Sequence, residues 1–496
     1  MLDKLKSTAK NSFIYGIGNL STKFIGLILL PLYTHVLPVS EFGMLAMLES
    51  TSQVLITIFG LSLYNAFLRW YWEKEYEERR NSMFFTVLVF LTLVSALMVV
   101  SLIGGSRILA SYLLENSQYY RLIRLMVVTA GFEIIGVLPL TLLRVQERPV
   151  MFITANIIKF VVNLSLTVLF IVVLKHRIEG IYEAQIIGNI VFFLFLSRYI
   201  WKHSEARFDH KVLREMLSFS LPLVLSSIAG LFLTLTDRFT LRFSSGLEQV
   251  GNYQFGFKIA NAIKVIVLNS ISFALAPVIY KVINEKGSRR FYSKILTYTG
   301  FVVMIIVMVI SFFGKEIAMI MAEKKEYRSA FILIPVLSMG HYFGSLKDIL
   351  FTGLNITKKT KVSAIIITFV SAINVVLNIG FIFLFHTMGA AIATAFSQLI
   401  YLLLVWKYSQ KYFYIDYEWQ KLIKITVTGS LLIVAAMYSN NLPLVGSLFA
   451  KLILLAVYPL ILYYWKFFEG IEIDRLKGFW NKWKNPMKWK QNLKTT

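Results

Sequence analysis

The sequence predicts an all-α polytopic membrane protein with about 14 transmembrane helices. Of its 496 residues, 57% are hydrophobic and only 16% are charged, whereas soluble domains average roughly 45–50% and about 25%. The apolar residues fall in windows of about 20, the length that an α-helix needs to cross a bilayer. The two halves of the chain also resemble each other over these windows, which is typical of transporters.

The apolar windows define the predicted spans. In chain order they are 11–34, 42–66, 82–104, 119–143, 150–174, 180–200, 217–238, 251–280, 292–313, 329–353, 362–384, 389–406, 421–438 and 447–465. The connections between them are short, so we expect no separate soluble domain. The first span follows MLDKLKSTAK without a small-residue cleavage site, and we expect it to be retained as a helix.

Positive charge is distributed unevenly between the two sides. Most of the 51 Lys and Arg residues lie in alternate connections, such as 67–81, 198–216 and 281–294, and in the tail from 466. Positive residues in short loops mark the cytoplasmic side. Both termini are therefore predicted to be cytoplasmic. Topology also accounts for the formal charge of +24, so we expect no nucleic-acid partner.

Several kinds of chemistry are excluded by composition. The chain has no cysteine and six scattered histidines, which excludes disulfides and thiolate metal sites. No GxxxxGK[ST] motif for nucleotide phosphates is present. We therefore predict no cofactor and no metal, and energy drawn from an ion gradient or from consumption of the product.

The repeat has an offset of 208 residues. LPVSEFGMLAM (37–47) aligns with SGLEQVGNYQF (245–255), which matches Gly43 to Gly251. Six spans separate equivalent helices, so the two copies run parallel, and substrate is expected between them. The predicted organisation is a six-helix bundle at 1–203, a second at 204–410, helices 13 and 14 at 411–467, and a basic amphipathic cytoplasmic tail at 468–496.

Polar stripes on equivalent helices predict a cavity between the bundles. A charge near the bilayer centre costs roughly 2.5–3.5 kcal/mol, so charged side chains within spans should face protein or water. The predicted cationic, substrate-binding cavity comprises Lys23, Lys159, Lys258, Lys264, Asn19, Gln53, Gln254 and Asn261. Candidates for ion coupling are Glu49, Glu133 and Asp237. The alternative is that each Lys only neutralises a buried acid such as Glu49.

Asp237 and Arg238 stand side by side near the predicted periplasmic end of the seventh span. We expect Asp237 to continue the inward polar stripe. We expect Arg238 to reach lipid headgroups, since long basic side chains near span ends extend toward the interface.

Two segments resemble a known family. NSFIYGIGNLSTKFIGLILLPLYTHVLPVSEFGMLAM (11–47) and FSLPLVLSSIAGLFLTLTDRFTLRFSSGLEQVGNYQFGFKIANAI (219–263) are similar to helices 1–2 and 7–8 of bacterial polysaccharide transporters. These are O-antigen-type lipid-linked oligosaccharide flippases of the multidrug/oligosaccharidyl-lipid/polysaccharide exporter superfamily. The resemblance implies a flippase, not an enzyme, in the bacterial cytoplasmic (inner) membrane. It also implies three kinds of partner: an undecaprenyl-pyrophosphate-linked glycan, membrane lipids and other polysaccharide-assembly proteins.

Other functions stay open at this point. A multidrug exporter of the same superfamily would share the fold, but its cationic substrates favour an acidic cavity. A peptidoglycan-precursor flippase is a close neighbour. A membrane glycosyltransferase usually carries a large periplasmic loop with catalytic acids, and the longest such connection here is only 314–328. The identity of the sugars and of the coupling ion does not follow from the sequence.

Overall fold

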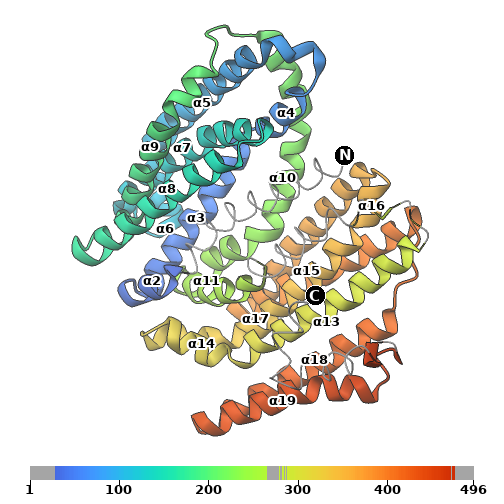
Figure 1. The fold of residues 1–496 in the computed structure, drawn as a ribbon. Coiled ribbons are helices and arrows are strands. Elements are labelled where there is room, and N and C mark those ends of the chain that lie inside the picture. Colours follow the sequence, from blue (N-terminus) through green and yellow to red (C-terminus); the bar gives the residue numbers. More distant parts are fainter. Residues whose placement is uncertain are drawn as a thin grey trace, which may run out of the picture. The chain divides into compact units, whose positions relative to one another are not determined.

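The computed structural model describes residues 28–264, 279, 282, 283, 285, 287–470 and 472–474. These residues form helices and no strand (Figure 1). The helices are α2 (Leu30–Val36), α3 (Val39–Phe59), α4 (Leu63–Trp70), α5 (Arg80–Gly104), α6 (Ser106–Leu114), α7 (Tyr120–Val145), α8 (Pro149–Val168), α9 (Arg177–Lys202), α10 (His210–Ser245), α11 (Leu247–Ala262), α13 (Ser288–Phe312), α14 (Gly314–Met321), α15 (Leu333–Leu350), α16 (Thr352–Ile356), α17 (Thr360–Tyr412), α18 (Trp419–Ser439) and α19 (Leu444–Tyr464). Short 3-10 turns η1 (Lys74–Arg79), η2 (Ser117–Tyr119) and η5 (Lys325–Ile332) and a π-helical turn η3 (Leu169–Val173) complete the described elements.

The all-helical membrane fold is confirmed. Within the described residues, 11 helical segments are long and apolar enough to cross a membrane. One of them, α17, has 53 residues and covers two predicted spans, because His386 takes a left-handed φ of 50° and turns the chain there. The predicted number of fourteen spans stays a prediction.

The chain divides into two compact units. The larger contains Met1–Ser288 and Gly314–Tyr414, and the smaller contains Arg289–Phe313 and Ile415–Thr496. The smaller unit therefore groups α13 with α18 and α19, although α13 belongs to the second copy of the repeat in sequence.

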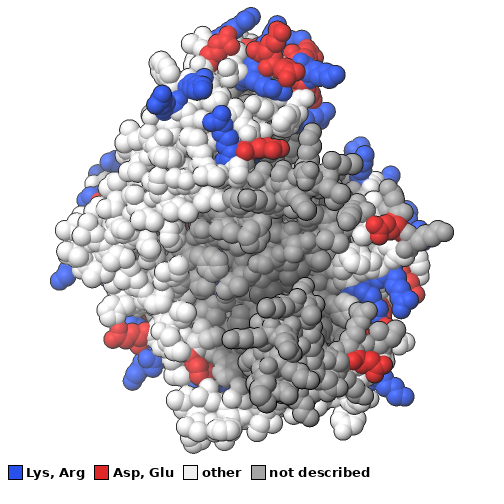
Figure 2. Space-filling model, in the orientation of Figure 1, with Lys and Arg blue, Asp and Glu red and all other residues white. Residues whose placement is uncertain are grey.

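Charged side chains gather at one end of the larger unit. Figure 2 shows them crowded over the end where α4, the start of α5 and the start of α10 meet. This end carries the loops at 71–79 and 203–209, which were predicted to be cytoplasmic. Elsewhere on these helices large apolar side chains such as Leu97 and Val100 are exposed, as expected of a surface that faces lipid.

The helix pair α3 and α11 shows the repeat at atomic detail. A Cβ added at Gly43 would lie 1.9 Å from the Leu247 carbonyl oxygen, and one at Gly251 would lie 2.0 Å from the Val39 carbonyl oxygen. The offset of 208 maps Val39 onto Leu247 and Gly43 onto Gly251, so the same contact is made twice. Glycine is required at both positions because the two backbones touch.

The second predicted span is interrupted. Helix α3 ends at Phe59 and α4 begins at Leu63, and Leu61 and Ser62 between them have φ values of 51° and 50°. Left-handed backbone costs residues other than glycine of order 1–3 kcal/mol each. Irregular backbone at membrane depth is tolerated where it is buried in protein or lines a cavity.

An ionic cluster organises one end of the smaller unit. Lys294 of α13 binds Glu418 at 2.8 Å and also Glu469, and Lys421 of α18 binds the same two carboxylates at 3.0 and 3.1 Å. Hydrogen bonds from Lys294 and Lys421 lower the pKa of Glu469 to about 2. Burial acts to raise the pKa of Glu418, but its hydrogen bonds from Lys294, Lys421 and Thr297 outweigh burial and lower it. The segment after α19 is thus held to α13 and α18.

Candidate functional site

The predicted cavity residues come from five helices of the larger unit. Asn19 and Lys23 lie outside the described residues. The others are Glu49 and Gln53 on α3, Glu133 on α7, Lys159 on α8, Asp237 on α10, Gln254, Lys258 and Asn261 on α11, and Lys264 just after α11. Most of them fall into three groups, and Gln254 belongs to both the first and the third, because it donates to Glu49 and accepts from Arg238.

The first group joins the two copies of the repeat. Lys258 Nζ lies 3.3 Å from Glu49 Oε1, and Gln254 Nε2 donates to Glu49 Oε2 at 3.5 Å. The ammonium also lies 5.2 Å from the centre of the Phe42 ring, a cation–π contact. Gln53, one turn further along α3, is exposed. This group therefore places one cation and one anion between α3 and α11.

The second group lies within the first copy of the repeat. Lys159 Nζ binds Glu133 Oε1 at 2.6 Å, which joins α8 to α7. The ammonium also lies 5.5 Å from the centre of the Phe192 ring. Glu133 is thus both a predicted coupling residue and the partner of a predicted substrate-binding residue.

The third group is a buried network at the end of α10. Arg238 binds the Asp237 carboxylate and the Gln254 side chain at 2.8 and 2.9 Å, and it donates to the Thr234 carbonyl. The Tyr253 hydroxyl donates to Asp237. The expectation that Arg238 reaches lipid headgroups is wrong, since its side chain is only 4% exposed. A guanidinium beside a carboxylate, an amide and a carbonyl has its hydrogen bonds satisfied inside the protein.

A polar pocket of about 100 Å³ lies next to this network in the second copy. Its polar lining includes Asp237, Asn261, Lys264 and two residues that were not predicted, His341 and Gln398. The buried Nε2 of His341 and Oε1 of Gln398 make no hydrogen bond within the described residues. The repeat offset carries a signal for His341, because it maps Glu133 onto that position. The second segment of the repeat, in which GIYEAQIIGN (180–189) aligns with GAAIATAFSQ (389–398) at an offset of 209, carries a signal for Gln398, because it maps Asn189 onto that position.

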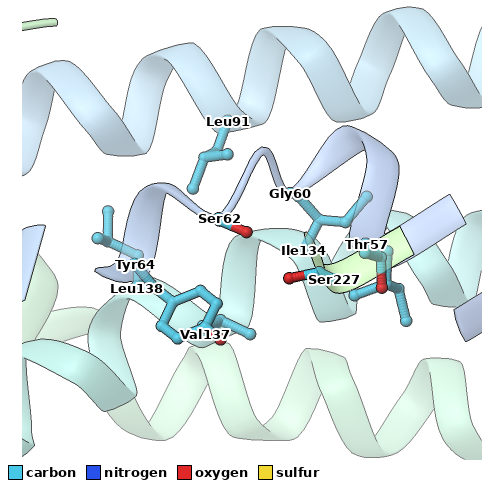
Figure 3. A pocket seen from close by; sticks show the side chains of 10 residues that line it. Thr57, Gly60, Ser62, Tyr64, Leu91, Ile134, Val137, Leu138 and Ser227 are labelled. Atoms are coloured by element: carbon cyan, nitrogen blue, oxygen red, sulfur yellow. The ribbon is translucent and has the colours of Figure 1, made fainter. Parts of the chain in front are cut away.

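A second pocket, of about 210 Å³, lies at the interruption between α3 and α4 (Figure 3). Figure 3 shows the lining side chains gathered around the irregular backbone at Gly60–Ser62. Hydroxyls of Thr57, Ser62 and Tyr64 and of Ser227 on α10 share the lining with apolar side chains of α5 and α7. No charged residue lines this pocket in the described part of the chain, so it suits a neutral group.

The acidic and histidine side chains of the described residues are not arranged as a metal site. Among the residues that the structure describes, no group of three or more His, Asp or Glu side chains is placed to hold a metal ion. The acids of the three groups instead face Lys or Arg. What the arrangement can do is exchange partners: a Lys released from its Glu would bind an anion.

A family model for polysaccharide biosynthesis proteins matches residues 8–283, more than half of the chain. The chain belongs to this family. The matched residues include both segments, 11–47 and 219–263, that resemble polysaccharide transporters. The predicted family membership is therefore confirmed. A second model, for MatE proteins, matches residues 222–380.

Solved structures of low sequence identity share the fold. The structure of "Lipid II flippase MurJ, inward closed conformation" is similar with a TM-score of 0.71 and 17% identity, over 90% of this chain and 99% of that one. An inward-facing multidrug resistance MATE family transporter of the MOP superfamily gives a TM-score of 0.66 and 14% identity, over 78% and 94%.

A curated relative is similar in sequence over a shorter stretch. It is an uncharacterized membrane protein, MJ1068, of Methanocaldococcus jannaschii, which is 27% identical over 200 residues. That match covers 39% of this chain and 38% of the relative.

Proposed function

We propose that this protein is a flippase that moves an undecaprenyl-pyrophosphate-linked oligosaccharide from the cytoplasmic to the periplasmic leaflet by alternating access. The observation that carries the proposal is the family match over residues 8–283. The fold shared with MurJ, a lipid II flippase by its title, supports it. The protein then works as a transporter and not as an enzyme, in a bacterial inner membrane with both termini in the cytoplasm.

The chemistry of the head group accounts for the Lys–Glu pairs. A pyrophosphate is a dianion or more, and it needs cations when it leaves water. A bare ammonium in an empty cavity would itself be costly. Glu49 beside Lys258 and Glu133 beside Lys159 solve this problem, because each Lys stays neutralised at 3.3 and 2.6 Å until phosphate replaces the carboxylate.

In this scheme the displaced carboxylates are the candidate sites for ion coupling. Glu49 and Glu133 lose their Lys partners when phosphate arrives, and each is then free to bind a coupling cation. Asp237 keeps Arg238 as its partner at 2.8 Å and accepts a hydrogen bond from Tyr253 of α11, so we assign it to holding α10 against α11 instead of to coupling.

The remaining parts of the substrate need different surroundings. The pocket at Gly60–Ser62, with hydroxyls and no charge in its described lining, suits a neutral sugar residue. The polyprenyl chain stays in lipid beside the exposed apolar helices. The bundles at 1–203 and 204–410 would rock against each other, and helices 13 and 14 (411–467) and the tail (468–496) would lie outside this motion.

A multidrug exporter is the second candidate, because the MatE model matches residues 222–380. Its cationic substrates would compete with Lys258 and Lys159 for the acids, whereas an anion would compete with the acids for the lysines. A peptidoglycan-precursor flippase is a variant of the first proposal with the same pyrophosphate chemistry.

Deletion of the gene in its host tests the proposal. The lipid-linked glycans that accumulate are extracted, and their leaflet is determined by accessibility to an enzyme added outside. We expect complete glycan-lipid to accumulate on the cytoplasmic face. Precursors that lack one sugar would indicate a glycosyltransferase, and unchanged glycan-lipid with increased drug sensitivity would indicate an exporter.

A further inference from the structure

Two contacts at the predicted periplasmic end are related by the repeat. Thr34 Oγ1 donates to the Met321 carbonyl at 2.5 Å, and Arg242 Nε donates to the Leu113 carbonyl at 2.8 Å. The offset of 208 maps Thr34 onto Arg242 and Leu113 onto Met321. A donor in the first copy thus reaches the second copy, and the equivalent donor reaches back, as in an isologous interface. We name these contacts clasp A (Thr34–Met321) and clasp B (Arg242–Leu113).

The elements that carry the clasps are equivalent too. Clasp A joins the end of α2 to α14, and clasp B joins the end of α10 to α6. By the same offset, α6 begins at the position that corresponds to the start of α14, and η2 begins at the position of η5. The backbone contact of Gly43 with Leu247, and of Gly251 with Val39, also joins the two copies.

The clasps differ in chemistry. In clasp B, Arg242 also donates to the Tyr112 carbonyl at 2.9 Å and binds Glu115 at 3.0 Å, with its side chain 11% exposed. Clasp A itself uses a neutral hydroxyl. Beside it, the Tyr327 hydroxyl donates to the Leu37 carbonyl at 3.0 Å, the Lys324 ammonium donates to the Val36 carbonyl at 3.1 Å, and the exposed His35 pairs with Glu323. Arg242 differs from these groups because one nearly buried guanidinium makes three contacts with the other copy. Charged donors make the stronger hydrogen bonds.

We propose that clasps A and B hold the periplasmic mouth closed, that both break when the cavity opens to that side, and that Arg242 contributes most to the closed state. This inference rests on the proposed transport cycle. It follows from geometry, since each clasp joins residues 1–203 to residues 204–410 at the end opposite the basic loops. Parts that rock against each other have to separate at such contacts.

The absence of native cysteine makes the proposal testable by thiol labelling. Thr57, which lines the pocket at the helix interruption, is changed to Cys, and a membrane-impermeant maleimide is added from the periplasmic side. Arg242→Gln should raise the labelling rate about tenfold, because loss of a charged hydrogen-bond network shifts the population of open molecules by about that factor. Thr34→Val should raise it less.

Arg121→Gln is the matched control. Arg121 also lies at this end of the fold and binds Glu183 and Glu179 at 3.2 and 3.5 Å, but both partners belong to the same copy of the repeat. Its loss should leave labelling unchanged. Equal labelling of Arg242→Gln and the parent, or an equal rise in Arg121→Gln, would overturn the proposal.

A cross-link tests the same point by replacing the hydrogen bond of clasp A with a covalent bond that can be reduced. Thr34→Cys with Met321→Cys should form a disulfide that blocks glycan export until it is reduced. Ser371→Cys with Ala229→Cys is the control, because Ser371 donates to the Ala229 carbonyl at 2.6 Å within one copy, and its cross-link should leave export intact. Full export with clasp A cross-linked would contradict the proposal.

The two proposals fail in different ways. If labelling depends on the clasps but the protein exports no glycan, the role of the clasps is supported and the proposed substrate is contradicted.

Discussion

At the scale of single residues, three of the intramembrane cations in the described part of the chain stand beside acids that lie in spans as well. Lys258 faces Glu49, Lys159 faces Glu133, and Arg238 faces Asp237. The sequence predicted that these residues would avoid lipid, because the cost of a charge in hydrocarbon depends on residue type and on depth within the span. It named Glu49 as an acid that a Lys could neutralise, but it did not predict which Lys, because pairing across helices depends on how the helices pack.

Variants of the Lys258–Glu49 pair test whether Lys258 binds the phosphate of the substrate or only neutralises the Glu49 carboxylate. Lys258→Gln should lower glycan export about 10- to 100-fold, since a charged hydrogen bond to phosphate contributes about 1.5–3 kcal/mol, and Lys258→Arg should retain part of it. The double variant Lys258→Gln, Glu49→Gln should stay low. Recovery of export in the double variant, measured at equal abundance, would mean that Lys258 only neutralises Glu49. Lys211→Gln, in a pair where both side chains are about two-thirds exposed or more, serves as the control.

At the scale of elements, periodicity and the repeat predicted most helices. Two features were not predictable. The interruption at Leu61–Ser62 uses left-handed backbone in residues without a strong preference for it, so tertiary packing overrides local propensity there; the turn at His386, by contrast, falls in the predicted break between the spans 362–384 and 389–406. The grouping of α13 with α18 and α19 depends on side chains far apart in sequence, such as Lys294 and Glu469.

The crossing of α3 and α11 predicts a strict requirement for glycine. Gly43→Ala and Gly251→Ala should each destabilise the protein by roughly 2 kcal/mol or more, because the added Cβ meets a backbone carbonyl that cannot move alone. Thermal unfolding of the purified protein in detergent measures this. Gly104→Ala is the control, since nothing lies within 4 Å of the added atom. Equal melting temperatures for all three variants would contradict the crossing.

The cluster at Glu469 predicts a dependence on pH. The pKa of Glu469 is lowered to about 2 by Lys294 and Lys421, against about 4.3 in an unfolded chain. Its contribution to stability is therefore complete above about pH 4.3 and is lost as the pH falls toward 2. Glu469→Gln should melt at a lower temperature than the parent at pH 6, and the difference should narrow below pH 4. If the difference in melting temperature between Glu469→Gln and the parent does not change with pH, the ion pairs are not its cause. Glu75→Gln, at an exposed surface residue, is the control.

At the scale of the whole molecule, the distribution of Lys and Arg predicts the orientation. Reporter fusions near Lys74, Arg207, Lys286 and Lys490 should report cytoplasm, and fusions near Val39 and Leu442 should report periplasm. Paired reporters with opposite compartment specificity measure this in cells. A periplasmic signal at Lys286 would break the parallel repeat of six helices.

The candidate site was only partly predictable at this scale. The polar stripes placed Glu49, Gln254 and Lys258 on helices that do meet, because the repeat fixes which helices are equivalent. The polar pocket with His341 and Gln398 involves α15 and α17. Polar residues recur at helical spacing on α15, at Ser338, His341, Ser345 and Asp348, so the stripe is visible in the sequence. That α15 and α17 enclose one pocket with α10 and α11 required the packed structure.

The central claim is that this protein moves a lipid-linked anionic glycan across the bilayer. The most direct test is reconstitution of the purified protein into vesicles with a radiolabelled polyprenyl-pyrophosphate oligosaccharide in both leaflets. A sugar-oxidising reagent added outside then measures how much substrate becomes accessible with time. We predict that wild-type protein exposes nearly all of the substrate, whereas Lys258→Gln vesicles stop at the fraction in the outer leaflet. An equal plateau in wild-type and protein-free vesicles would contradict the account.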